Sequence, residues 1–283
     1  MPENYLLAMN LDVKYAIVTG AASGMGRCYA LQLAQMGYGV LLVDINGDAS
    51  YELSRLITQE YDVPAPVLCV DLTLPDAAKR VFDKCQEDSL RVEILINNAG
   101  MLITSAIEET DPQRLLRIIA LHCTTPLLLC RQFVPLMKEQ GRGYILNISS
   151  ITAWMDWPVI GIYGCTKRFV KGYSRELRIE CKDSPVSITT AIFGAVDTPL
   201  LGSLPFMQSR KMLMHLGFMI SPEKATRLAL KAMFHRKTTL IPCISDRIVI
   251  LLCPLIPNWL LSLMQKKIKL FKFRMLIKNN ATT

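Results

Sequence analysis

Hydrophobic positions along the chain form two kinds of run. Short, nearly continuous apolar runs alternate with longer stretches in which apolar residues recur at helical spacing. Parallel strands that are covered on both faces require such continuous apolar runs. The runs that predict buried strands span residues 14–19, 40–44, 66–71, 93–97, 143–149 and 186–192, and a shorter one at 238–242 would close the sheet.

The stretches between these strands have the length and period of helices, for example residues 26–37 and 111–140. Alternation of strand and helix predicts an α/β fold in which right-handed crossovers build a doubly wound, Rossmann-like parallel sheet. No repeat or low-complexity linker divides the 283 residues. We therefore expect a single dinucleotide-binding catalytic domain over residues 1–246, followed by an amphipathic, basic helical extension over residues 247–283.

Charge separates these two parts. Of the 32 Lys and Arg residues, seven lie in residues 247–283, and none of the 24 Asp and Glu residues does, so the preceding chain is nearly neutral. A nucleic-acid-binding protein carries its basic residues on a face of the folded body, so we expect no nucleic-acid partner. Nine scattered cysteines without C-x-x-C pairs fit a reduced, cytoplasmic interior rather than a disulfide framework. The first fourteen residues lack the features of a secretory signal.

The first predicted strand leads into the glycine-rich stretch "TGAASGMG" at residues 19–26. Glycines at 20, 24 and 26 would let the backbone turn tightly at the start of a helix, where free N–H groups can bind a pyrophosphate. The second strand ends at Asp44, whose carboxylate can accept hydrogen bonds from the adenosine ribose and would repel a 2′-phosphate. We therefore expect NAD as the cofactor, with NADP disfavoured.

Tyr163 and Lys167 lie four residues apart in "YGCTK", which places them on one face of a predicted helix. An ammonium beside a phenol favours the phenolate, so this pair is a candidate for proton transfer. On its own the pattern is common on amphipathic helices. It gains weight because "TGAASGMG" (19–26), "NNAG" (97–100), "NISS" (147–150) and "YGCTK" (163–167) occur in this order.

Together these four motifs resemble the short-chain dehydrogenase/reductase family over residues 14 to 242. The resemblance implies that Tyr163 is the general acid/base, that Ser150 hydrogen-bonds the substrate oxygen, and that Lys167 lowers the pKa of the tyrosine and binds the nicotinamide ribose. It also implies a homodimer or homotetramer. The cofactor contacts that it implies are Gly20, Ser23, Gly24, Met25, Gly26, Asp44, Asp71, Asn98, Ala99, Gly100, Tyr163, Lys167, Val196 and Thr198.

The chain departs from the family pattern at two positions. Phe193 replaces a proline, and we expect it to pack in the core. His122 replaces an asparagine that, in the family, positions a water in the proton relay behind the lysine. A histidine can hold such a water and titrates near neutral pH. The alternative is a buried histidine without a catalytic part, and both remain open at this point.

Methionines at 207, 212, 214 and 219 follow the segment of Val196 and Thr198, in the region where the family has the segment that covers the substrate. Flexible thioethers suit an apolar ligand, so we expect a steroid, a bile acid or a long acyl chain, although a methionine stripe can also be core. The sequence around Tyr163 and the stretch "IPNWLL" resemble the branch that holds 17β-hydroxysteroid dehydrogenases and 3-oxoacyl-CoA reductases. The rival to this oxidoreductase is a non-catalytic dinucleotide-binding sensor or scaffold on the same fold.

The end of the chain combines an apolar stretch at 247–264, broken by two prolines, with cations that alternate with Leu, Phe and Ile over 265–278. The prolines make it a poor membrane span. A basic amphipathic segment suits the surface of an anionic membrane, which would add peripheral membrane association to a cytoplasmic protein. Folding of the extension over the substrate mouth or against a partner subunit is an equal alternative.

Overall fold

The structure is a computed structural model that describes residues 13–156, 160–202, 209–263 and 265–266. Its main sheet has seven strands, all parallel to their neighbours, in the order β3-β2-β1-β4-β5-β6-β9. Their bounds are β1 (Lys14–Thr19), β2 (Gly39–Asp44), β3 (Val67–Cys69), β4 (Arg91–Asn97), β5 (Gly143–Ser150), β6 (Val186–Phe193) and β9 (Thr239–Leu240). The predicted doubly wound α/β fold is confirmed.

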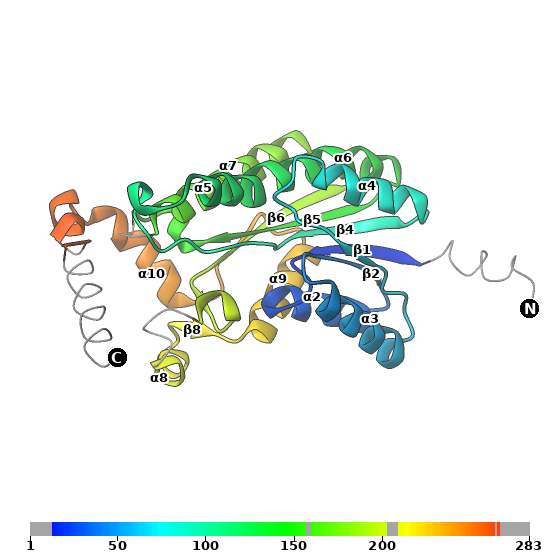
Figure 1. The fold of residues 1–283 in the computed structure, drawn as a ribbon, viewed down its shortest axis with the longest axis horizontal. Coiled ribbons are helices and arrows are strands. Elements are labelled where there is room, and N and C mark those ends of the chain that lie inside the picture. The colour runs from blue at the N-terminus through cyan, green and yellow to red at the C-terminus, as the bar shows by residue number, and fades with distance from the viewer. Residues whose placement is uncertain (1–12, 157–159, 203–208, 264, 267–283) are drawn as a thin grey trace, which may run out of the picture.

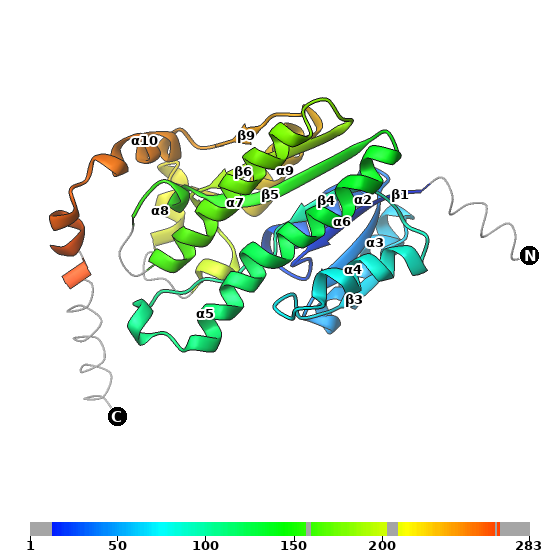
Figure 2. The same ribbon diagram turned by 90° about the horizontal axis from the view of Figure 1, so that it is seen from above.

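Helices cover both faces of this sheet (Figure 1). One face carries α2 (Gly24–Gln35), α3 (Gly47–Tyr61) and α9 (Pro222–Phe234), and the other carries α4 (Ala77–Glu87), α5 (Pro112–Ile119), α6 (Thr125–Glu139) and α7 (Gly161–Glu180). Two further helices, α8 (Arg210–His215) and α10 (Ile244–Leu252), lie outside these layers at one end of the molecule (Figure 2). This is the layering that continuous apolar strands demand, because neither face of the sheet can be left in water.

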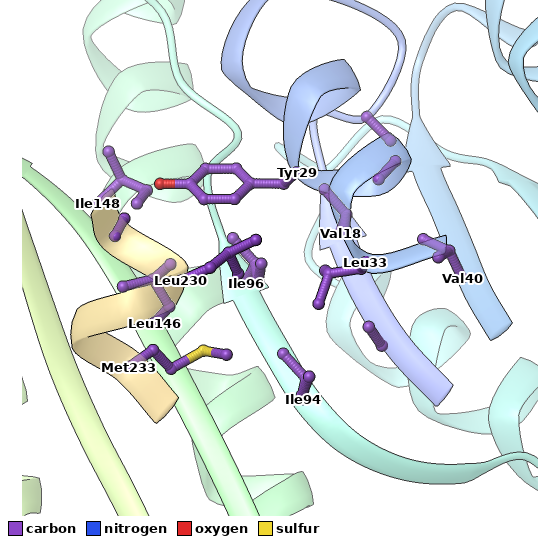
Figure 3. Packing of buried hydrophobic residues seen from close by; sticks show 14 of the residues in the cluster. Val18, Tyr29, Leu33, Val40, Ile94, Ile96, Leu146, Ile148, Leu230 and Met233 are labelled. Carbon is purple, nitrogen blue, oxygen red and sulfur yellow. The ribbon is translucent and has the colours of Figure 1, made fainter. Parts of the chain in front are cut away.

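The core on the α2–α9 face forms where these two helices cross the centre of the sheet. Tyr29 and Leu33 from α2 and Leu230 from α9 pack onto strand residues such as Ile96 and Leu146 (Figure 3). All five side chains are fully or almost fully buried. Burial of a large apolar side chain contributes about 1.5–3 kcal/mol, so this layer holds the ends of β1, β4 and β5 in a fixed arrangement.

Helices α5 and α6 run continuously through one π-helical turn at Ala120–Thr124. Within the described residues, this 112–139 segment has the length and composition that could cross a membrane. Here Leu129, Phe133 and Met137 are buried in the core on the α4–α7 face of the sheet. One side of the segment therefore packs into the core, and its π turn holds His122, described below.

Two features near the C-terminal end were not predicted. A two-stranded parallel ribbon pairs β7 (Ala195–Val196) with β8 (Met219–Ile220), which ties the segment after β6 to the segment before α9. Helix α10 begins at Ile244, so the boundary that we predicted after residue 246 falls inside a helix.

Candidate active site

The largest concentration of sequence motifs lines one pocket of about 430 Å³ at the carboxyl ends of the strands. In a doubly wound sheet this edge is where ligands bind. Every predicted cofactor residue except Gly26 lines the pocket, and so does Ser150. Phe193 lines it too, although its side chain is 97% buried and belongs to the core on the α2–α9 face, as expected.

The glycine-rich loop forms the floor of this pocket. Gly20 has φ of +67°, a conformation that favours glycine, and a Cβ there would lie 2.9 Å from the Cα of Ala99. Gly26 lies beneath the loop, where a Cβ would collide with the carbonyl of Gly20. Helix α2 then starts without a side-chain cap, since Ser23 makes no hydrogen bond to its first turn. Its N-terminal N–H groups are thus left for a ligand, which fits a dinucleotide pyrophosphate.

Thr19 joins this loop to the "NNAG" turn. Its hydroxyl donates to the carbonyl of Ile96 at 3.1 Å and accepts the N–H groups of Asn98 and Ala99 at 3.0 and 3.1 Å. The side-chain amide of Asn98 donates back to the carbonyl of Thr19 at 2.9 Å. These reciprocal hydrogen bonds fix two segments that are distant in sequence as one surface.

Two carboxylates line the pocket, Asp44 at the end of β2 and Asp71 after β3. Asp44 accepts the N–H of Ala22 at 2.9 Å with one oxygen and the N–H of Asn46 at 2.9 Å with the other. Asp71 accepts from Thr73 and from Arg117, whose guanidinium lies 3.2 Å away. Burial raises the pKa of Asp71, but the hydrogen bonds from Thr73 and the charge of Arg117 together lower it. Asp71 is therefore charged at neutral pH.

Ser150, Tyr163 and Lys167 reach the pocket from two elements. Ser150 ends β5, whereas Tyr163 and Lys167 lie one turn apart on α7. The ammonium nitrogen of Lys167 lies 5.6 Å from the centre of the Tyr163 ring and donates to the carbonyl of Ile148 at 3.0 Å. The carbonyl of Lys167 accepts the hydroxyl of Ser149 at 2.9 Å, which ties α7 to β5. The predicted triad is thus assembled at one place.

The ionisation of this pair is governed by burial. Burial raises the pKa of Tyr163 to about 12, and hydrogen bonding with Ser150 acts in the opposite direction. Burial lowers the pKa of Lys167 to about 8. We predicted from the sequence that the lysine would lower the pKa of the tyrosine. In this structure desolvation of the phenolate outweighs any such effect.

His122 lies in the π turn, outside the pocket lining, and both of its ring nitrogens have protein partners. Nε2 accepts the N–H of Met101 at 3.0 Å, which places the proton on Nδ1. Nδ1 lies 2.8 Å from the hydroxyl of Thr166, and this hydroxyl donates to the carbonyl of Tyr163 at 2.8 Å. Burial, followed by the charge of Lys167, holds the pKa of His122 well below its usual value. The near-neutral titration that we expected from the sequence is therefore not what this environment gives.

Several lining residues were not predicted. Ile45, Leu72, Thr73, Arg117, Leu121, Leu200 and Leu201 also line the pocket. Thr19 and Thr166 do not line the pocket but hydrogen-bond to the segments that do. Their roles were not predicted, because each lies inside a motif whose function we had attributed to other residues. Of the predicted methionine cover, residue 207 lies outside the described residues, and Met212, Met214 and Met219 do not line this pocket.

Met214 and Met219 instead line a second pocket of about 640 Å³, to which β8 contributes. Its walls come from the 214–220 segment, the start of α9 and α10.

Comparison with known proteins agrees with the geometry. The family model described as short chain dehydrogenase matches residues 14–208. A 17-beta-hydroxysteroid dehydrogenase type 3 from Danio rerio is 27% identical over 71% of this chain and 66% of its own length. A very-long-chain 3-oxoacyl-CoA reductase from Mus musculus is 29% identical over 66% of this chain and 61% of its own length. The predicted branch is thus present among the relatives.

A solved structure is similar over most of the chain. It is a short-chain dehydrogenase from Sphingobium yanoikuyae in complex with NADPH, 28% identical, with a TM-score of 0.73 over 81% of this chain and 88% of its own. The shared fold includes the strand edge at which the pocket lies.

Proposed function

This chain belongs to the short-chain dehydrogenase family, and on that premise we propose that it interconverts a secondary alcohol and a ketone on an apolar substrate with NAD(H). The observation that carries the proposal is the convergence of Ser150, Tyr163 and Lys167 on the pocket that the glycine-rich loop also lines. A dinucleotide held along that loop would have its nicotinamide end at this triad.

NAD(H), when bound, supplies or accepts the hydride at the substrate carbon. Tyr163 holds the proton that the substrate oxygen gains in reduction and loses in oxidation. Ser150, on the adjacent end of β5, donates a hydrogen bond to the same oxygen and orients it. Lys167 presents a cation beside the Tyr163 ring, where it would favour the phenolate and could hold the ribose of a bound dinucleotide.

The preference for NAD over NADP rests on Asp44. Its carboxylate lines the pocket at the end of β2, and two backbone N–H groups fix it there. A second anion at the same place would be repelled. Among the described lining residues, the cations are Lys167 and Arg117, and Arg117 is already paired with Asp71.

The apolar substrate is supported by two observations. The pocket that the triad lines also has apolar residues in its wall, among them Leu121, Leu200 and Leu201. The relatives compared above are named for a hydroxysteroid and for a very-long-chain 3-oxoacyl-CoA, and the steroid body and the very long acyl chain are apolar.

We assign His122 a positioning role rather than a place in a proton relay. Its two ring nitrogens are occupied by Met101 and Thr166, so a relay water would have to displace one of them. The chain of hydrogen bonds from Met101 through His122 and Thr166 to the carbonyl of Tyr163 joins the "NNAG" turn to the catalytic helix.

The test is substitution of Tyr163 by Phe, measured with a panel of hydroxysteroids, bile acids and 3-hydroxyacyl thioesters at the reduced-nicotinamide absorbance. We expect kcat to fall by about 10²–10⁴, while the dissociation constant of NADH, measured by fluorescence, stays within a few-fold. The matched control is Tyr173→Phe, another tyrosine of α7 that does not line the pocket.

Full activity of Tyr163→Phe would refute the assignment. A wild-type protein that binds NADH and turns over no member of the panel would favour the non-catalytic sensor or scaffold instead.

A further inference from the structure

Helix α10 has the reverse of the usual amphipathic arrangement. Its one buried side chain is Asp246, which is 5% exposed. Its exposed apolar side chains recur at helical spacing, namely Ile244, Ile248 and Leu251, the last of which is 74% exposed, and its exposed charged residue is Arg247. A surface helix normally buries its apolar residues and presents its polar residues to water.

The orientation of α10 is fixed by a specific contact, so it is not a loosely packed end. The carboxylate of Asp246 accepts the N–H of Gly194 at 3.0 Å, directly after β6. A Cβ on Gly194 would meet the end of this carboxylate, so a larger residue there would require the Asp246 side chain to shift. The contact holds Asp246 inward, while Ile244, Ile248 and Leu251 remain exposed.

The apolar surface continues on both sides of α10. Along the chain, Leu255 and Trp259 are 76% and 68% exposed, and Leu263 follows them. Across the second pocket, the segment around α8 exposes Met212, Leu216 and Phe218. The two parts share one surface because Leu216, Phe218, Ile244 and Ile248 all line that pocket. We call this surface the apolar end face: residues 212–218 together with 244–263.

This face lies beyond one end of the sheet, remote from α3 and α4 (Figures 1 and 2). No described residue after Leu201 lines the candidate active site, so the described part of the extension does not close it. Contiguous exposed apolar surface on this scale marks an interaction site rather than ordinary exposure.

Charge indicates what the partner is. No acidic residue follows Asp246, whereas Arg247 and six Lys or Arg residues between 266 and 278 do. Next to the face, Lys211 and Lys224 are exposed, and Glu223 and Asp197 are the nearby acidic groups, of which Asp197 lies 4.0 Å from Arg210. Apolar residues, an exposed tryptophan and flanking cations are the combination that binds the interface of an anionic bilayer.

We propose that the apolar end face docks onto the surface of an anionic lipid bilayer, with Leu251, Leu255 and Trp259 inserted at the headgroup–acyl boundary and the exposed cations beside the face, among them Arg247 and Lys266, on the headgroups. The binding is peripheral, because Pro254 and Pro257 interrupt the apolar stretch. This inference stands independently of the proposed reaction, since none of the residues concerned lines the candidate active site.

The test is sedimentation of the full-length protein with vesicles of phosphatidylcholine and phosphatidylglycerol in equal parts, compared with vesicles of phosphatidylcholine alone. The variant Leu251→Ser/Leu255→Ser/Trp259→Ser removes the inserted side chains. All three are exposed, so the fold is retained. We expect the wild type to partition onto the anionic vesicles and the variant to partition about a hundredfold less.

The matched control is Met36→Ser/Tyr51→Ser/Ile179→Ser. It removes three apolar side chains of 52–58% exposure that lie elsewhere, directly after α2, in α3 and in α7. This control should partition like the wild type. Lys266→Glu/Lys267→Glu/Lys269→Glu should remove the preference for anionic vesicles. Tryptophan quenching by brominated lipid should be present in the wild type and reduced in Trp259→Phe.

Equal partitioning of the wild type and the Leu251/Leu255/Trp259 variant would overturn the proposal. So would the absence of vesicle binding in a wild type whose oligomers, measured by light scattering, dissociate in that variant. In that case the face would be a subunit interface.

Discussion

Lys167 offers a quantitative test of how the site is built, because an ammonium with a lowered pKa must depend on pH in a defined way. Burial moves the pKa of this side chain from 10.5 to about 8. The unfolded chain therefore binds a proton more tightly than the folded chain does between these two values. A displacement of this size corresponds to about 3 kcal/mol of stability.

The sign follows from proton linkage. Between about pH 8 and pH 10.5 the unfolded state carries the proton that the folded state has lost, so stability rises with pH in this window. Below pH 8 the folded protein bears the full cost of a buried ammonium. Replacement by methionine, which is similar in length and has no charge, removes this dependence. It also leaves the carbonyl of Ile148 without its donor, a cost that does not vary with pH.

The assay is urea unfolding of the cofactor-free protein, followed by circular dichroism, for the wild type and for Lys167→Met at about pH 7 and about pH 10.5. We expect the wild type to gain about 3 kcal/mol relative to the variant across this interval. Other lysines and tyrosines titrate in both proteins and cancel in the difference. Lys182→Met controls for the loss of an exposed lysine. A wild-type-minus-variant difference that is flat with pH would refute the desolvation of Lys167, and with it the dry environment that we assign to the triad.

Two further outcomes can be measured on the same protein. Asp44→Ala removes the carboxylate that fixes the N–H groups of Ala22 and Asn46 and that would accept the ribose hydroxyls. We expect kcat/KM for NADH to fall about tenfold, and the preference for NADH over NADPH to fall with it. An unchanged preference would show that Asp44 does not select the cofactor. His122→Asn keeps a polar partner for Met101 but is too short to reach Thr166 in the same way. We expect the free energy of unfolding to fall by about 1–2 kcal/mol. The pH dependence of kcat should stay unchanged around neutrality, because the lowered pKa of His122 keeps the ring neutral there, and a shifted pH–rate profile would instead support a part for His122 in the proton relay.

The sequence predicted the sheet well because buried parallel strands leave a strong local pattern. Residues 14–19 match β1 completely, and six further runs each overlap a strand. The third run was predicted to reach Asp71 but pairs only over Val67–Cys69, since β3 is an edge strand with a single neighbour. The β7–β8 ribbon was missed because two-residue strands have no periodicity to detect.

In the candidate active site too, features that depend on local sequence were predicted and features that depend on tertiary packing were not. Residues in the four motifs converge as predicted because each motif ends a strand or starts a helix, and the fold brings those points to one edge. The partners of His122 could not be predicted, because Met101 and Thr166 meet it only through the π turn. The raised pKa of Tyr163 is likewise a property of burial, which helix spacing alone does not reveal.

The contact between Gly194 and Asp246 links two positions that are 52 residues apart, so we expect them to vary together among homologues. A Cβ at the first position would meet the carboxylate at the second, which would then have to turn away from the backbone N–H that it accepts. A homologue that acquires alanine or a larger residue after its sixth strand must therefore give up this hydrogen bond, replace the acid or reorient the last helix. A glycine and an aspartate at this separation would identify, from sequence alone, relatives in which the last helix has the same orientation.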